Sequence, residues 1–423
     1  MRERIAIIGS GIAGMGAAWQ LREQADITLI ERESRPGGHT NTVFVEEDGQ
    51  MVPIDTGFIV FNHATYPNLV QLFKDLNVAT KPSEMSFSVQ YLPDGLEYNG
   101  MGPDKLFAQR RNLFNPRFHH LIAQILRFFR IARKALNHPE TLECTVGEFT
   151  RQHGLNANFL NHYLIPMSSA VWSTEPGRIL DFPALSLIRF FQNHGFLGVT
   201  THHPWFTVSG GSQCYREKLL AALNPVKLPA KVVEVKESAH SASVRIEGGT
   251  RLEFDRVIIA AHADEALRML PEPDDSQRRL LGAFRYQPNI ATLHTDARVM
   301  PHTKRAWASW NYRVEKNLEG DSEATTHYWM NALQGVSKKK NYFVSVNGEE
   351  AISHEKILYQ TTYEHPVFTL PAMQAQTELP SLNTRSPDQR LFFCGSYFRY
   401  GFHEDAYKSA VDLASIIRPL LRQ

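Results

Sequence analysis

The chain has 423 residues, of which 43% are hydrophobic and 21% are charged, a balance typical of a globular protein with a large buried core. Its formal net charge of +1 provides no overall attraction to nucleic acid, so we expect no nucleic-acid partner. The three cysteines form no CxxC pattern, which argues against a disulfide framework or a structural zinc site. No apolar run reaches the ~20 residues that a membrane-spanning helix needs, and the first residues lack the pattern of a signal peptide. These features predict a cytoplasmic protein.

Residues 5–31 have the pattern of a βαβ unit. The apolar runs 5–8 and 27–30 predict two buried parallel strands. Between them, a GxGxxG turn precedes a predicted helix and consists of Gly9, Ser10, Gly11, Ile12, Ala13 and Gly14. The first glycine of this motif permits a tight turn, the second lets the backbone approach a pyrophosphate, and the third lets the helix pack on the strand. Glu31 follows at about the distance at which an acidic residue binds ribose hydroxyls. The unit predicts dinucleotide binding; the alternative is a glycine turn kept only for packing.

The later predicted elements fall into two groups. Residues 105–195 are predicted to be mainly helical, and the aromatic-rich segments of 285–370 favour an antiparallel sheet. Strands at 231–235, 256–261 and 390–395, with a last helix ending at Leu421, continue the pattern of the first unit. The predicted fold class is therefore α/β, with a Rossmann-type domain interleaved with a substrate domain. The expected boundaries are 1–75, 205–284 and 389–423 for the nucleotide-binding domain, 76–204 for the helical part of the substrate domain and 285–388 for its sheet.

A second glycine motif follows the βαβ unit. Residues 32–42 resemble the Arg-x-Gly-Gly-Arg-x-x-Ser/Thr fingerprint of the flavin-containing amine oxidase and phytoene desaturase superfamily. The doublet is Gly37-Gly38, and His39 stands where that superfamily usually has arginine. The segment Asp55-Thr56-Gly57-Phe58 resembles the superfamily's next motif, which runs beside the flavin ring. Val233 matches the strand whose backbone usually meets adenine.

The end of the chain resembles the motif that closes the flavin site in the same superfamily. Gly395-Ser396 and residues 401–406 carry this likeness, although Ser396 replaces the usual Asp or Glu and can offer a ribityl hydroxyl only a neutral partner. The resemblance implies an amine oxidase-like fold and FAD. We expect the FAD to be non-covalent, because the cysteine of 209–215 comes too early for the known covalent link. The expected FAD-binding residues are Gly9, Ser10, Gly11, Ile12, Ala13, Gly14, Glu31, Arg32, Gly37, Gly38, His39, Thr56, Gly57, Phe58, Val233, Gly395, Ser396, His403, Glu404 and Asp405.

Within the superfamily, the chain is most similar to a bacterial branch associated with cyclopropane-fatty-acid-synthase-like methyltransferases. The segments that carry this likeness are 286–289, 307–312, 328–331, 363–368 and 401–405. The resemblance implies a desaturase of methyl-branched unsaturated fatty acyl chains on phospholipid, with O2 or a quinone as electron acceptor. Two alternatives stay open. One is an amine or amino-acid oxidase, and the other is a flavin-binding lipid-handling protein without catalysis.

Several polar residues are candidates for chemistry. His403 is the candidate catalytic base, because histidine titrates near neutral pH and this position adjoins the expected flavin site. Glu404 and Asp405 are equally expected to cap the last helix, and Glu364-His365 is a second acid–base candidate. Tyr397 and Tyr400 are candidate substrate-channel residues. We predict no metal site, because the pairs His119-His120 and His202-His203 lack the i, i+4 spacing of helical ligands.

Residues 105–138 are basic and contain no acidic residue. On a helical wheel the apolar residues share one face, while Arg127, Arg130 and Lys134 gather on the other. One interpretation is an ordinary amphipathic helix on a core. The other is a helix that docks on anionic lipid headgroups, which would place the protein peripherally at the inner face of the membrane.

Overall fold

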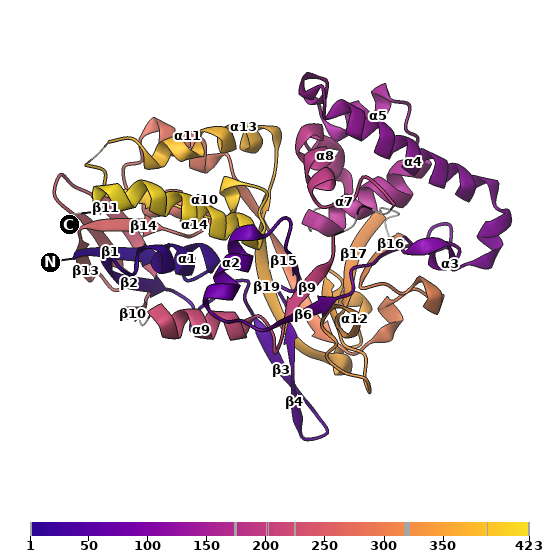
Figure 1. The fold of residues 1–423 in the computed structure, drawn as a ribbon, viewed down its shortest axis with the longest axis horizontal. Helices are drawn as coiled ribbons and strands as arrows, with labels where there is room; N and C mark the ends of the chain where they lie inside the picture. The colour runs from indigo at the N-terminus through magenta and orange to yellow at the C-terminus, as the bar shows by residue number, and fades with distance from the viewer. Residues whose placement is uncertain are drawn as a thin grey trace.

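The computed structural model describes residues 2–172, 176–199, 201, 203–223, 226–316, 322–386 and 388–421. Figure 1 shows two halves side by side. One contains both chain termini and a parallel sheet between helices, and the other contains a large sheet and a group of helices at its outer end. The description therefore follows these two halves.

The first half is built on a five-stranded parallel sheet in the order β10-β2-β1-β14-β20. Its strands are β10 Val226–Pro229, β2 Ala25–Glu31, β1 Glu3–Ile8, β14 Arg256–Ile259 and β20 Leu391–Phe393. The central strands are apolar on both faces because helices cover both sides of a parallel sheet. Along β1, Ile5 and Ile7 join the core of one face, whereas Ala6 and Ile8 join the core of the other. The interleaving of early, middle and late strands is thus present in the sheet.

The helices around this sheet come from all three stretches of chain. The helices α1 Ile12–Leu21 and α14 His403–Ile417 pack against each other. The remaining helices of this half are α2 Pro67–Asp75, α9 Gln213–Leu223, α10 Ala263–Met269, α11 Asp275–Gly282 and α13 Leu370–Glu378. Figure 1 shows α11 and α13 on the opposite side of α14 from α1 and α9.

The strand expected at 231–235 differs from the prediction. Two strands occur here, and only β10 joins the parallel sheet. The second, β11 Val232–Glu237, forms a separate antiparallel sheet with β12 Ala242–Ile246 and β13 Arg251–Phe254. Val232 and Val235 are the buried residues of β11, and the β-bulge between Val232 and Glu234 allows these two residues, three positions apart, to share the covered face.

The second half contains a seven-stranded sheet in the order β19-β15-β18-β17-β16-β7-β8. Its pairs are antiparallel except β16 with β7, which agrees with the antiparallel sheet predicted over 285–370. The strands are β19 Ile357–Val367, β15 Arg285–His294, β18 Phe343–Val346, β17 Ser322–Trp329, β16 Trp310–Lys316, β7 Phe87–Tyr91 and β8 Leu96–Asn99. The short helix α12 Met330–Gln334 follows β17.

Smaller strands and a helical group complete this half. A hairpin joins β3 Thr42–Glu47 to β4 Gln50–Asp55, and β9 Trp205–Val208 pairs with both β5 Phe61–Asn62 and β6 Thr80–Ser83. The helices at the outer end are α3 Gly102–Leu106, α4 Pro116–Ala135, α5 Val146–Gln152, α6 Ala157–Phe159, α7 Ile165–Trp172 and α8 Ala184–Asn193. The helical prediction for 105–195 is therefore confirmed for the described residues.

The helix α4 is the longest of this group. Asn115 caps it by accepting a hydrogen bond from the Arg117 N–H, and Pro116 occupies its first turn, where no backbone donor is needed. Phe118, Leu121, Phe128, Phe129, Ala132 and Ala135 are its buried residues. Within the described part of the chain, neither α4 nor any other helix is long and apolar enough to cross a membrane.

Candidate functional site

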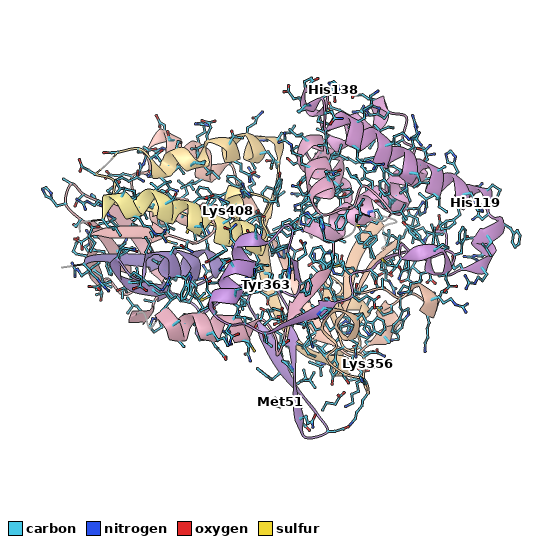
Figure 2. The ribbon with its side chains drawn as sticks, viewed as in Figure 1. Met51, His119, His138, Lys356, Tyr363 and Lys408 are labelled. Carbon is cyan, nitrogen blue, oxygen red and sulfur yellow. The ribbon has the colours of Figure 1, made fainter. Side chains whose placement is uncertain are left out.

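A cavity of about 1250 Å³ extends along both halves of the molecule. Its lining includes the carboxyl ends of β1 and β2, the strands β15 and β19, and the helices α4, α7 and α8. Tyr363 of β19, which lines this cavity, lies where the two halves meet (Figure 2). Small-molecule pockets usually have volumes of about 300–1,000 Å³, so this space can hold an elongated nucleotide and a second ligand together.

Most residues expected to bind FAD line this cavity. They are Gly9, Ser10, Gly11, Ile12, Ala13, Glu31, Arg32, Gly37, Gly38, His39, Thr56, Gly57, Phe58, Val233, Gly395, Ser396 and His403. Tyr397 and Tyr400, the candidate substrate-channel residues, also line it. The fold therefore brings together motifs that are hundreds of residues apart in the sequence.

The three glycines of the first glycine turn have different surroundings. Gly9 has φ +98°, and a Cβ there would lie 2.7 Å from the Ala260 carbonyl oxygen. A Cβ at Gly14 would lie 1.9 Å from the Gly9 carbonyl oxygen, so this position needs glycine for close packing. A Cβ at Gly11, by contrast, would meet no atom within 4 Å and would project into the cavity. The three glycines thus match the three roles that the motif predicts.

Glu31 holds the two glycine segments in register. Its carboxylate accepts hydrogen bonds from the Ser10 N–H at 2.9 Å, the Ser10 hydroxyl at 2.6 Å and the Glu33 N–H at 3.0 Å. The Ser10 hydroxyl oxygen in turn accepts a hydrogen bond from the Gly37 N–H at 3.2 Å. The Arg32 guanidinium pairs with Glu265 at 2.5 Å at the same edge of the cavity.

The second glycine segment contains a half-buried neutral histidine. The Arg35 guanidinium donates to the carbonyl oxygens of Thr40 and Gly38, at 2.7 and 2.9 Å, and fixes the loop. His39 stacks on Tyr363 with ring centroids 4.7 Å apart. Burial lowers the pKa of His39 well below its ordinary value, with neighbouring His365 acting in the same direction. His39 therefore replaces the usual arginine with an uncharged ring.

His403 lines the cavity, but its contacts differ from those expected of a catalytic base. Its Nε2 lies 2.5 Å from the Tyr215 hydroxyl, and its ring stacks on Phe58 with centroids 3.9 Å apart. Burial lowers the pKa of His403 to about 3. A general base works best when its pKa is near the working pH, so this geometry does not favour the expected role. It gives His403 the position of a clamp between Phe58 and Tyr215.

Gly14, Glu404 and Asp405 were also expected to bind FAD but do not line the cavity, and Gly14 instead has the packing role that the motif gives to its third glycine. Glu404 caps α2, because its carboxylate accepts hydrogen bonds from the backbone N–H groups of Asn68 at 3.1 Å and Leu69 at 2.9 Å. Asp405 accepts a hydrogen bond from the Phe402 N–H at 3.0 Å at the start of α14. Burial raises the pKa of Asp405 to about 7. The expectation that Asp405 caps the last helix is thus confirmed, whereas Glu404 caps a different helix.

One face of β19 contributes residues that the sequence analysis largely missed. Tyr359, Thr361, Tyr363 and His365 alternate along this strand and all line the cavity. Asn289 on the neighbouring strand β15 donates to His365 Nδ1 at 2.8 Å, and burial lowers the pKa of His365 to about 4. The two-residue alternation of Tyr, Thr, Tyr and His was the available signal, and of these positions only His365 was a candidate.

The far end of the cavity is apolar. Its lining includes Met85, Phe87, Leu106, Ile122, Ile125, Leu126, Phe129, Met167, Val171, Trp172, Phe190, Phe196 and Trp205. Among the described lining residues between 85 and 205, no Asp, Glu, Lys or Arg occurs. This end therefore suits a long hydrocarbon group rather than a charged one.

The residues present fit FAD. Gly11 leaves open space at the turn where a pyrophosphate would approach the backbone. His39 and Tyr397 line the cavity, and the His39 Nε2 atom and the Tyr397 hydroxyl have no hydrogen-bond partner in the described part of the chain. No cysteine is among the described residues that line the cavity, and non-covalent binding stays a prediction.

The part of the chain that the structure describes has no comparable site for a metal ion. Among the residues that the structure describes, no group of three or more His, Cys, Asp or Glu side chains is placed to hold one. His119 and His120 are exposed on α4. His202 of the other histidine pair lies outside the described residues.

Comparison with known proteins adds a family and a set of related folds. The family model for flavin-containing amine oxidoreductases matches residues 12–330. A 15-cis-phytoene desaturase from Synechococcus elongatus is 36% identical over 87 residues, which make up 20% of this chain and 18% of the desaturase. The sequence match thus spans less than a fifth of that relative.

Solved structures match over nearly the whole chain. Putrescine oxidase bound to putrescine has a TM-score of 0.68 with 15% identity and 99% coverage of both chains. A fatty acid isomerase from P. acnes that produces CLA has a TM-score of 0.68 with 15% identity and 98% coverage of both chains. Cyclohexylamine oxidase from Brevibacterium oxydans has a TM-score of 0.68 with 16% identity, covering 98% of this chain and 99% of the oxidase. At this identity the likeness establishes the amine oxidase-like fold, and the matched relatives differ in what they act on.

The family match covers most of the chain, and the cavity presents the glycine turns and the closing motif that a flavin dinucleotide needs. The chain therefore belongs to the flavin-containing amine oxidoreductase family and is an FAD-dependent oxidoreductase.

Proposed function

We propose that this protein is a desaturase of methyl-branched, unsaturated fatty acyl chains carried on phospholipid. The observation that carries the proposal is the apolar end of the cavity, which is continuous with the flavin end and has no charged lining residue among those described between 85 and 205. An ammonium substrate would be desolvated there without a counter-charge, at a high free-energy cost. The resemblance to the bacterial branch with acyl desaturases points to the same substrate class.

The chemistry follows from the weakest bond of such a chain. Bound FAD supplies a two-electron acceptor for hydride removal from an allylic carbon. The positive charge left on the chain is delocalised over the double bond and is stabilised further by a methyl substituent. Loss of a proton from the adjacent carbon then gives a diene, and O2 or a quinone takes up the two electrons. The protein's part is to hold the chain, to exclude water and to accept that proton.

The chain's own residues can be assigned to two of these tasks. Ile122, Ile125 and Phe129 of α4 lie along the apolar wall and would position the hydrocarbon. Trp172 of α7 and Phe190 of α8 pack with ring centroids 4.7 Å apart on the same lining and would exclude water. No side chain is assigned to the proton transfer, because His365 Nδ1 already accepts a hydrogen bond from Asn289 and His403 Nε2 is engaged with Tyr215.

The purified, FAD-loaded protein should convert a methyl-branched monoenoyl phospholipid into a product two mass units lighter. One equivalent of electron acceptor should be reduced for each molecule converted. Membrane lipids compared by mass spectrometry with and without the gene should show the same relation. Turnover of amines or amino acids, with no change in any acyl lipid, would favour the oxidase alternative. Reduced flavin that reoxidises without turnover of either class would favour a non-catalytic role.

A variant that blocks the apolar end of the cavity tests directly whether the substrate occupies it. Ile125→Trp would fill the apolar end, so lipid turnover should fall at least tenfold while the flavin absorbance stays unchanged. Ala123→Trp, on the exposed face of the same helix, is the matched control and should retain activity. Equal turnover by the two variants would show that the substrate does not occupy this end of the cavity.

A further inference from the structure

The apolar end of the cavity reaches solvent beside α4. Among the described residues, three large apolar side chains both line the cavity and are strongly exposed: Val199 at 70%, Leu126 at 45% and Met101 at 43%. Residues that line a cavity and also face solvent lie where it opens. The opening is therefore rimmed by apolar side chains, which is an unusual way to expose a cavity to water.

The rim continues along α4 as a mixed stripe. Arg130 and Arg133 lie four and seven residues after Leu126, so they share its side of the helix. Arg127, by contrast, turns toward the loop after α5, where its guanidinium donates to the Gly154 carbonyl oxygen at 3.3 Å. The cations beside the opening are thus Arg130 and Arg133, a different set from the one that the helical wheel indicated.

A second exposed apolar site precedes α4. Phe114 is 88% exposed and its neighbour Leu113 is 45% exposed, although large apolar residues are usually covered. Arg117 lies one turn away at the start of α4. Among the described residues, Arg117, Arg130, Arg133 and Lys134 have no carboxylate partner. This part of the surface therefore combines uncovered apolar groups with uncompensated positive charge.

We propose that this surface, defined by Leu113, Phe114, Leu126, Arg130 and Arg133, docks on an anionic phospholipid bilayer. The cations would meet lipid phosphates while Phe114 and Leu113 enter the acyl boundary, which is the usual arrangement of an interfacial amphipathic helix. The opening beside Leu126 then faces the membrane, so an acyl chain enters the cavity without crossing water. The delivery of an acyl chain to the cavity rests on the proposed function, whereas the docking on the bilayer does not.

Vesicle flotation with the FAD-loaded protein tests the docking without any turnover. We expect binding to phosphatidylglycerol vesicles at low salt, weaker binding at high salt because the charges are screened, and little binding to phosphatidylcholine. Arg130→Gln with Arg133→Gln should weaken binding about thirtyfold, from about 1 kcal/mol per cation near an anionic surface. Phe114→Ser should weaken it about tenfold through lost apolar burial.

Matched controls lie elsewhere on the molecule. Met51, at 57% exposure, lies on the β3–β4 hairpin, far from His119 and His138, which mark the two ends of α4 (Figure 2). Met51→Ser removes a comparable exposed apolar group, and Lys338→Gln with Lys340→Gln removes two exposed cations. Neither control should change vesicle binding or the flavin spectrum.

Three outcomes would overturn the docking proposal. The first is a wild-type protein that ignores anionic vesicles at low salt, and the second is an equal loss of binding in the controls. The third is conversion of a dimer into a monomer by Phe114→Ser with vesicle binding unchanged, because the surface would then join copies of this chain.

Turnover of detergent-dispersed lipid separates this inference from the proposed function. Vesicle binding through α4 without desaturation of any lipid would leave the docking intact and refute the activity. Desaturation of detergent-dispersed lipid by a protein that does not bind vesicles would support the activity and refute the docking.

Discussion

Gly11 and Gly14 belong to one turn but should respond differently to substitution. Gly11→Val should fold normally, because φ at Gly11 is −64° and a Cβ there meets no atom, yet the side chain would occupy the pyrophosphate position. We expect a colourless protein whose melting temperature equals that of flavin-stripped wild type. Gly14→Val should lower stability or solubility, since its Cβ would overlap the Gly9 carbonyl. Retention of yellow colour by Gly11→Val would place the phosphates elsewhere.

His403 should matter for flavin retention more than for the chemical step. His403→Ala removes the ring that stacks on Phe58 and bonds to Tyr215, so FAD should dissociate more readily. The rate per bound flavin should stay within about threefold of wild type, whereas loss of a general base typically lowers it ~10²–10⁴-fold. Rapid-reaction measurement of flavin reduction, normalised to flavin content, tests this. A loss in the larger range with full occupancy would restore His403 as the base.

At the scale of elements, Glu404 joins two helices that are far apart in the sequence. Glu404→Ala would leave the Asn68 and Leu69 N–H groups of α2 without their buried acceptor. Each unsatisfied buried group costs about 1–3 kcal/mol, so denaturant unfolding should show a loss of several kcal/mol. Asp412→Ala in the same helix breaks only the exposed contact with Lys408 and should cost under about 1 kcal/mol. Similar losses in the two variants would show that Glu404 does not cap α2.

The elements that the sequence predicts well are those set by local pattern. The strands expected at 5–8 and 27–30 appear as β1 and β2, and the glycine turn lies between them as predicted. The partners of side chains could not be predicted in the same way. Glu404 reaches Asn68 across 336 positions and His403 reaches Tyr215 across 188, and no periodicity encodes such contacts. The alternation of β19 could have revealed Tyr363, but its place beside His39 depends on how two sheets meet.

At the scale of the whole molecule, buried neutral histidines should make stability depend on pH. The histidines whose pKa burial lowers include His39, His194, His294, His327, His365 and His403. An unfolded histidine takes up a proton near pH 6.5, whereas these do not while folded, so the unfolded state binds more protons below pH 6.5 and stability falls as pH falls. Asp405 opposes this trend, since its raised pKa favours the folded state on acidification, as do Asp55 and Glu404 in direction.

The histidines outnumber these carboxyl groups, so the melting temperature of the FAD-loaded protein should drop between pH 6.5 and 5. Each histidine in excess of the opposing carboxyl groups should lower the free energy of unfolding by about 1 kcal/mol for each pH unit of acidification. His327→Gln should make the decline shallower, because it removes one of these groups from beside Ser345. A melting temperature that is flat or rises over this interval would contradict the burial of neutral rings.

The late arrival of β20 in the parallel sheet has a consequence for biosynthesis. β14 pairs with β1 on one side and with β20 on the other, and about 130 residues separate β14 from β20. A ribosome adds ~5–20 residues per second. The apolar edge of β14 therefore stays unpaired on the nascent chain for on the order of ten seconds, and an open apolar edge is a template for aggregation. The same delay applies to the closing turn at Gly395 and His403, so the flavin can be enclosed only after residue 403 has been added to the chain. We therefore expect cellular yield to depend on chaperones that shield this edge more than on the stability of the finished fold.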